Sequence, residues 1–163
     1  MLDPNATQRL DPGVVMLWRL QRIVRLALVS IPTLVGLGIL AATADVVPAA
    51  LLVVVVMTLI AINIVFAVFW PALEYNAYRY TVRDQDLLVQ SGVLFRRWSS
   101  IPHNRIQHVD TRQGPLERVF GLSRLLVFTA AGMSADGSIP GLKTEEAERL
   151  RDLLSRRGGD DGV

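Results

Sequence analysis

The residue types that carry most enzyme chemistry are scarce in this chain. Cysteine is absent, and the two histidines are His103 and His108. A hydrolytic trio can be written from Ser99 or Ser100, His108 and Asp110, because His108 and Asp110 would share one face of a regular strand. No nucleophile elbow or organised oxyanion site accompanies these residues. The sequence therefore predicts no catalytic residues and a protein that is not an enzyme.

Metal and cofactor sites have equally little support. His103 and His108 are an odd number of positions apart, so a regular strand would point them to opposite faces, and only a bulge near Pro102 would change that. The lack of cysteine removes thiolate nucleophiles, disulfides and cysteine-ligated metals. The glycines are dispersed and form no phosphate-binding loop. We expect neither a metal nor a cofactor.

The basic residues are the more informative polar group. Between Arg79 and Arg124 the chain has eight arginines and four acidic residues. Four of these arginines flank the first predicted strands, nearest the apolar region: Arg79, Arg83, Arg96 and Arg97. A guanidinium fork matches phosphate geometry, and each basic residue at an anionic surface contributes about 1 kcal/mol. These four are predicted to contact lipid phosphates, with a solvated arginine face as the alternative. No basic helix or aromatic stacking platform indicates nucleic-acid binding.

Two uncharged stretches precede these arginines and determine where they lie relative to a membrane. No side chain from Leu26 to Ala44 is charged, and after Asp45 the next charge is Glu74. A bilayer core of roughly 30 Å needs about 20 helical residues, and helices satisfy their own backbone in lipid. The sequence therefore predicts a transmembrane hairpin over residues 16–75, with spans at about 24–44 and 48–70. A buried core hairpin is disfavoured because the rest of the chain is too short to cover it.

The flanks of the two spans predict their orientation. Three arginines precede the first span, Arg79 and Arg83 follow the second, and the connection between them has no lysine or arginine. By the positive-inside rule, both termini are expected to be cytoplasmic. Aromatic residues cluster at the same side, at Trp18 before the first span and at Phe69 and Trp70 near the end of the second.

One polar residue interrupts the second span. Asn63 lies toward its cytoplasmic half. An amide in a bilayer either forms a hydrogen bond to the neighbouring helix, which then only determines packing, or contributes to a small polar site. Asn63 is therefore predicted to make an intramembrane polar contact.

The chain changes character on either side of this hairpin. Turn signals at Asp3-Pro4-Asn5 and Asp11-Pro12-Gly13 predict an irregular cytoplasmic arm over residues 1–15. After Glu74, short β-prone runs predict a domain over residues 76–157, and residues 158–163 are expected to form a flexible tail. The predicted strands are Tyr78–Arg83, Leu87–Ser91, Val93–Trp98, Ile106–Thr111, Arg124–Ala130 and Ile139–Leu142.

Turns and a final helix complete this domain. Asp84-Gln85-Asp86 is predicted to be a hairpin turn, and Leu116–Phe120 one helical turn stopped by Gly121. Thr144 is predicted to cap a last helix. Its apolar face comprises Ala147, Leu150, Leu153 and Leu154. Short strands closed by one amphipathic helix favour a small barrel or sandwich.

Several short motifs in this domain occur in a characteristic order. They are Tyr80-Thr81-Val82, Leu88 to Gly92, Ser100-Ile101-Pro102, Arg105 to Val109, Gln113 to Leu116, Phe120-Gly121-Leu122, and Ile139 to Leu142 before Glu145-Glu146-Ala147. Together they resemble the bacterial pleckstrin-homology-like membrane proteins of the YdbS type, and the preceding hairpin is similar too. The resemblance implies an α+β membrane protein: a two-helix transmembrane hairpin, then a pleckstrin-homology-like β-barrel or sandwich with a C-terminal amphipathic helix. It also implies the bacterial plasma membrane as the location.

The leading functional hypothesis is a non-catalytic, membrane-anchored interaction or scaffold module. Its expected partners are membrane lipids and either further copies of itself or other membrane proteins. The first alternative is a sensor of anionic lipid headgroups, although Asp84 and Asp86 occupy the turn where eukaryotic headgroup-binding domains carry basic residues. The second alternative is a small accessory subunit of a transporter.

Overall fold

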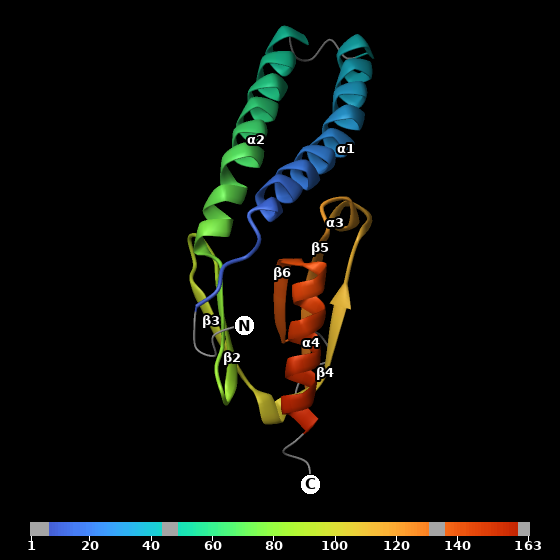
Figure 1. Ribbon diagram of the computed structural model, residues 1–163. Coiled ribbons are helices and arrows are strands. Elements are labelled where there is room, and N and C mark those ends of the chain that lie inside the picture. Colours follow the sequence, from blue (N-terminus) through green and yellow to red (C-terminus); the bar gives the residue numbers. More distant parts are fainter. Residues whose placement is uncertain (1–6, 44–48, 131–135, 160–163) are drawn as a thin grey trace. The chain divides into compact units, whose positions relative to one another are not determined.

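The computed structural model describes residues 7–43, 49–130 and 136–159 (Figure 1). The chain divides into two compact units. Trp18–Ala72 forms a helical unit, and the described residues up to Leu17 join those from Leu73 onward in a β-rich unit.

Two long helices make the helical unit. α1 comprises Gly13–Thr43 and α2 comprises Ala49–Ala77, so α1 begins before the predicted hairpin of residues 16–75 and α2 ends beyond it. Both are long and apolar enough to cross a membrane. Apolar side chains point outward on their faces, as Leu28 and Val54 do. Exposed apolar surface all round a helix suits lipid rather than water.

Two hydroxyl groups within these helices form hydrogen bonds within their own helix. Thr33 Oγ1 donates to the Val29 carbonyl and Thr58 Oγ1 to the Val54 carbonyl, both one turn back in the same helix. Such bonds remove the cost of an unpaired hydroxyl in hydrocarbon. Pro71 lies inside α2, which continues to Ala77.

Two antiparallel three-stranded sheets form the β-rich unit. The first has the order β1 (Arg79–Val82), β2 (Asp86–Ser91) and β3 (Arg97–Pro102). The second has the order β4 (Ile106–Arg112), β5 (Leu122–Thr129) and β6 (Gly137–Lys143). A 3₁₀ turn, η1 (His103–Arg105), links the sheets, and α3 (Pro115–Val119) links β4 to β5. This arrangement confirms the predicted fold class.

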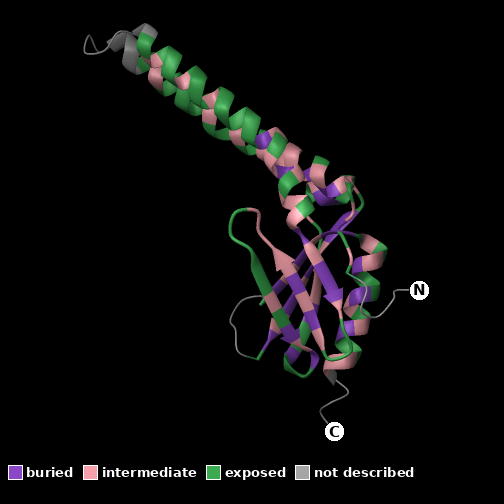
Figure 2. Ribbon diagram, turned by 90° about the vertical axis from the view of Figure 1, so that its left-hand side faces the viewer, coloured by how far each residue is buried: buried purple, intermediate pink, exposed green. Residues whose placement is uncertain are grey.

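The core lies between the sheets and the last helix, α4 (Thr144–Gly159). Buried residues alternate along β2 and β5, as half-buried strands require (Figure 2). α4 packs on the second sheet and buries Ala147, Leu150 and Leu154, which confirms the predicted apolar face. The Tyr80 hydroxyl donates to Glu146 Oε1 at 2.8 Å and so ties β1 to α4.

The stretch before α1 was predicted to be an irregular arm over residues 1–15; Thr7 to Pro12 is irregular except for one bridge, but it packs into the β-rich unit. The Gln8 N–H donates to the Tyr80 carbonyl at 2.7 Å, and the Tyr80 N–H donates back at 3.1 Å. Leu10 and Val14 are buried, and Gly13 begins α1 with its N–H bonded to Asp11 Oδ1. The turn predicted at Asp11-Pro12-Gly13 is present, but the residues that this stretch contacts lie far along the chain. The expectation for residues 1–6 lies outside the described residues.

Strand prediction failed at one place. The run Val93–Trp98 was expected to be a strand, whereas β3 begins at Arg97 and residues 92–96 form a loop. Gly92 has φ +98°, and a Cβ there would lie 1.9 Å from the Phe95 carbonyl oxygen. The loop therefore folds back on Gly92, which only glycine permits.

Candidate membrane-facing site

The loop between β2 and β3 displays large apolar side chains. Leu94 is 74% exposed and Phe95 is 89% exposed at its tip. Arg96 and Arg97 follow directly, and then Trp98, which is 59% exposed. Exposed apolar residues flanked by arginine and tryptophan are the composition of membrane interfaces, where rings lie at headgroup level and guanidinium groups meet phosphate.

A polar pocket lies beside this loop. It has a volume of about 420 Å³. Its lining comes from the end of α2, from β1 and β2 and from the loop: Leu73, Asn76, Ala77, Arg79, Gln90, Gly92, Val93 and Arg96. Arg79 and Arg96 thus share one pocket although 17 positions separate them in the chain. Arg79 Nη1 also donates to the Tyr78 carbonyl at 2.6 Å, which anchors the guanidinium at the end of α2.

Strand register places Arg97 at the same end of the first sheet. Arg79 is opposite Gln90 on β2, and Ser91 is opposite Arg97 on β3. Three of the four predicted arginines, Arg79, Arg96 and Arg97, therefore lie at the end of the sheet that carries the loop.

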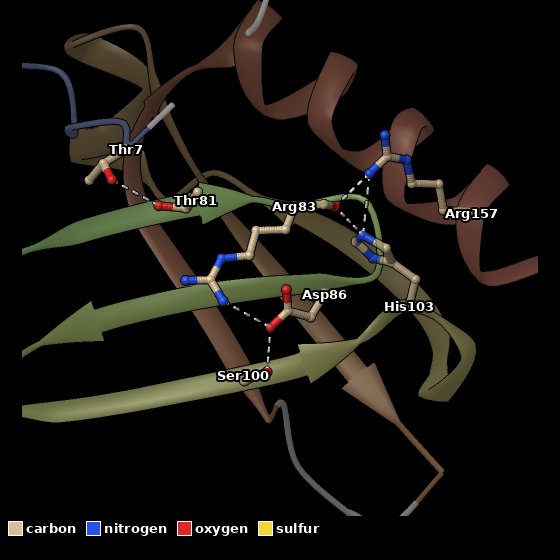
Figure 3. A network of polar contacts seen from close by, with 7 residues as sticks. All are labelled: Thr7, Thr81, Arg83, Asp86, Ser100, His103 and Arg157. Atoms are coloured by element: carbon tan, nitrogen blue, oxygen red, sulfur yellow. Dashed lines mark hydrogen bonds and ion pairs between the residues drawn. The ribbon is translucent and has the colours of Figure 1, made fainter. Parts of the chain in front are cut away.

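Arg83 lies at the other end. It directly follows β1. At a strand rise of about 3.3 Å per residue, Arg83 lies about 13 Å along the strand from Arg79. Its guanidinium lies 3.8 Å from the Asp86 carboxylate, and its carbonyl accepts hydrogen bonds from His103 Nε2 and Arg157 Nη1 (Figure 3). Arg83 thus takes part in a polar network that joins the first turn to η1 and α4. The structure does not place it with the other three arginines.

The groups considered for catalysis are dispersed. His103 is buried in the polar network, whereas His108 stacks on Phe128 with ring centroids 4.2 Å apart. Ser100 Oγ donates to Asp86 Oδ2 at 2.5 Å, rather than to a histidine (Figure 3). Within the described ranges, no group of three or more histidine, aspartate or glutamate side chains could hold a metal ion.

Asn63 belongs to the helical unit. Its Nδ2 donates to the Leu59 carbonyl at 2.9 Å, one turn back in α2, so the hydrogen bond that the structure gives it is within its own helix. The side chain also lines a pocket of about 290 Å³ between α1 and α2.

Two apolar helices of membrane-spanning length and a six-stranded unit closed by a helix define a membrane-anchored, pleckstrin-homology-like protein. A family model described as the bacterial PH domain matches residues 29–158. The chain belongs to this bacterial PH domain family.

Two relatives from Bacillus subtilis (strain 168) agree with this assignment. The UPF0699 transmembrane protein YdbS is 40% identical over 103 residues, which are 62% of this chain and 63% of that protein. The UPF0699 transmembrane protein YdbT is 24% identical over 86 residues, 52% of this chain and 17% of that protein. The chain therefore spans less than two thirds of either relative. No solved structure matches. The family and the apolar helices together make this a membrane protein.

Sequence reasoning singled out the four arginines and did not single out Leu94 and Phe95. Both were assigned to a strand, in which alternate side chains would be buried. A signal was nevertheless present, because Gly92 precedes three consecutive apolar residues that end at a pair of arginines. A glycine inside a strand pattern is a sign of a bulge or a turn, so Gly92 marked the place where the strand could be interrupted.

Proposed function

We propose that the protein is a non-catalytic, multi-pass protein of the bacterial plasma membrane whose PH domain lies on the cytoplasmic side, held against the anionic leaflet. The loop of residues 92–96 makes this contact. The observation that carries the proposal is the exposed pair Leu94 and Phe95, followed directly by two arginines. The arginine-rich flanks of the spans support the cytoplasmic orientation of both termini.

Chain connectivity supports a place for the loop near the bilayer. The pocket beside the loop is walled by Leu73, Asn76 and Ala77, the last turns of α2. These turns continue directly from the apolar span, so the part of the domain that contacts them cannot lie far from the headgroups. Arg83, at the other end of the first sheet, has no role in this contact.

Apolar and electrostatic contributions are expected to be similar. Full transfer of a leucine or phenylalanine side chain from water is worth about 1.5–3 kcal/mol, and partial insertion less. Arg79, Arg96 and Arg97 contribute about 1 kcal/mol each at an anionic surface. Added salt should weaken the arginine contribution and leave the apolar one. Binding of this loop to the membrane should therefore weaken only partly when salt is added.

The absence of cysteine provides the test. The variant Phe95→Cys of the full chain carries one thiol, which takes a polarity-sensitive dye or a spin label. Reconstituted into phosphatidylcholine vesicles with added phosphatidylglycerol, the label should report an apolar, water-shielded site. The effect should weaken when Arg96 and Arg97 are replaced by Gln. A label at Gln85→Cys, in the exposed turn at the other end of the sheet, is the matched control and should stay in water.

Equal exposure of the labels at residues 95 and 85 would contradict the seated arrangement. The full chain is required, because residues 7–17 pack into the domain and a fragment that begins after α2 lacks them. A water-exposed label at residue 95 in anionic vesicles would leave the arginines as a solvated face.

A second candidate is the interaction or scaffold role. It is supported by β3, whose outer edge pairs with no strand in the described part of the chain. An unpaired edge can accept a strand from another copy or from another membrane protein. Size determination and co-purification in mild detergent test this role, and Ser99→Lys should weaken assembly by placing a charge on the edge. A single copy without partners would contradict it.

A further inference from the structure

The polar pocket beside the loop of residues 92–96 is lined by two arginines, Arg79 and Arg96, and by two residues with amide side chains, Asn76 and Gln90. None of the residues that line it is acidic. We propose that this pocket binds the glycerol phosphate headgroup of one anionic phospholipid, with the phosphate between the two arginines and the headgroup hydroxyls at the two amides. The proposal rests on the proposed function, because contact of the loop with the membrane brings the pocket to the headgroups. It adds one ligand of defined chemistry and stoichiometry.

The two arginines carry charge that the described carboxylates do not balance. Arg79 Nη1 donates to the carbonyls of Tyr75 at 3.4 Å and Tyr78 at 2.6 Å, and a carbonyl leaves the charge of the guanidinium in place. Among the described residues, neither Arg79 nor Arg96 forms an ion pair. A guanidinium has further N–H donors on its other nitrogens. Two cations in one concave site attract an anion, and a phosphate can accept hydrogen bonds from both.

Strand register and a glycine bring these groups together. Arg79 lies directly opposite Gln90 on the neighbouring strand, so both side chains leave the same face of the first sheet. Two positions later the chain folds back at Gly92, where a Cβ would lie 3.6 Å from Arg96 Cα. Arg96 is therefore packed beside the end of the strand that carries Gln90. The turn at the other end of β1 and β2 is acidic and has no part in this site.

The remaining lining suits a phospholipid better than a free anion or a nucleotide. Leu73, Ala77 and Val93 add apolar surface next to the polar groups. No aromatic side chain is among the lining residues, so a base has no ring on which to stack. The volume of about 420 Å³ falls within the range of roughly 300–1,000 Å³ that small-molecule sites have. Free phosphate would use only the arginines, whereas a phospholipid headgroup also uses the amides and the apolar wall.

Native mass spectrometry of the full chain, stripped of lipid in mild detergent, measures this binding. Phosphatidylglycerol and phosphatidylcholine with the same acyl chains are the probes, and the competitors are inorganic phosphate and glycerophosphoglycerol, which is the deacylated headgroup. We expect one phosphatidylglycerol per chain, retained in preference to phosphatidylcholine. Glycerophosphoglycerol should displace it at a lower concentration than inorganic phosphate does. Equal displacement by the two competitors would identify a site for free phosphate and overturn the proposal.

Two neighbouring arginines provide a matched pair of variants. Arg96→Gln removes a guanidinium from the pocket, whereas Arg97→Gln removes the next one along the chain, which does not line it. Arg96→Gln should lower retention of phosphatidylglycerol by about fivefold, and Arg79→Gln/Arg96→Gln by about tenfold or more. Arg97→Gln should retain the lipid. A general attraction between lipid and positive charge would give equal losses in the two single variants, which would overturn the proposal.

Selectivity between lipids tests the two amides. Asn76→Ala/Gln90→Ala keeps both arginines and should lower the preference for phosphatidylglycerol over phosphatidic acid, which lacks the second glycerol. An unchanged preference would overturn the placement of the headgroup at the amides. Circular dichroism and the thermal transition verify that each variant keeps its fold.

Failure of this proposal is distinguishable from failure of the membrane contact. The pocket is measured in detergent, and the loop is measured in vesicles by the label at residue 95. A water-shielded label without selective retention of phosphatidylglycerol overturns the pocket alone. A water-exposed label overturns the membrane contact, and equal retention of phosphatidylglycerol and phosphatidylcholine overturns the pocket in either case.

Discussion

Gly141→Ala tests whether the segment before the first membrane helix is part of the PH domain. Gly141 has φ +64°, and a Cβ there would lie 2.3 Å from Val14 Cγ2 and 2.6 Å from Val14 Cβ. Val14 is fully buried, so it has little room to move. The left-handed backbone costs an alanine about 1–2 kcal/mol, and overpacking adds about 1–3 kcal/mol. The total is a loss of about 2–5 kcal/mol in the free energy of unfolding.

A second glycine separates these two contributions. Gly121 has φ +63°, but a Cβ there would have no neighbouring atom within 4 Å. Gly121→Ala therefore carries only the backbone cost. In a domain of this size, each kcal/mol lowers the melting temperature by about 4–8 °C. Thermal unfolding of the full chain in mild detergent should place Gly141→Ala clearly below Gly121→Ala.

A double-mutant cycle identifies the residue responsible. Val14→Ala removes both γ carbons, including the atom nearest the new Cβ, and keeps the Val14 Cβ, so Gly141→Ala should cost about 1 kcal/mol less in that background but not become free of strain. Equal losses for Gly141→Ala and Gly121→Ala, or no coupling to Val14, would refute the packing of this segment into the domain.

Three further predictions concern the contacts that hold the domain together. Burial, and then the hydrogen bond to Glu146, raise the pKa of Tyr80 above its usual value near 10, so stability should be constant below about pH 10 and fall as the pH rises further. Thermal unfolding against pH checks this, and Tyr80→Phe should flatten the alkaline limb and lower stability by about 1–3 kcal/mol. Gln8→Pro removes the N–H that bonds Tyr80 and should cost about 1 kcal/mol or more, whereas an unchanged melting temperature would mean that this bridge contributes nothing. Arg157→Ala removes a donor to the Arg83 carbonyl and should speed hydrogen exchange in the last turn of α4 without a large change in melting temperature.

The local sequence pattern was sufficient to predict most helices and strands. Uninterrupted apolarity predicted two helices of membrane-spanning length, and short β-prone runs predicted β2, β4 and β5. The spacing of Ala147, Leu150 and Leu154 predicted the buried face of α4. In each case the determining interactions lie within one element, so its own residues carry the signal.

The candidate site depended on interactions between distant residues. Sequence proximity to the membrane exit grouped Arg83 with Arg79, but a strand between them carries the two to opposite ends of the sheet. Leu94 and Phe95 have strand-like composition, and the close approach of the Phe95 carbonyl to Gly92 turns them into an exposed tip.

Composition and periodicity by themselves determined that this is a membrane protein with a small β domain, because hydrophobic burial and helix or strand period are properties of short segments. Only the tertiary structure decided that residues 7–17 complete that domain, and that Arg79 and Arg96 share a pocket. The hydrogen bonds of Gln8 to Tyr80 and the packing of Val14 against Gly141 join residues more than 70 positions apart. Such contacts depend on how the sheets and α4 close around one core, and no local pattern in the chain encodes them.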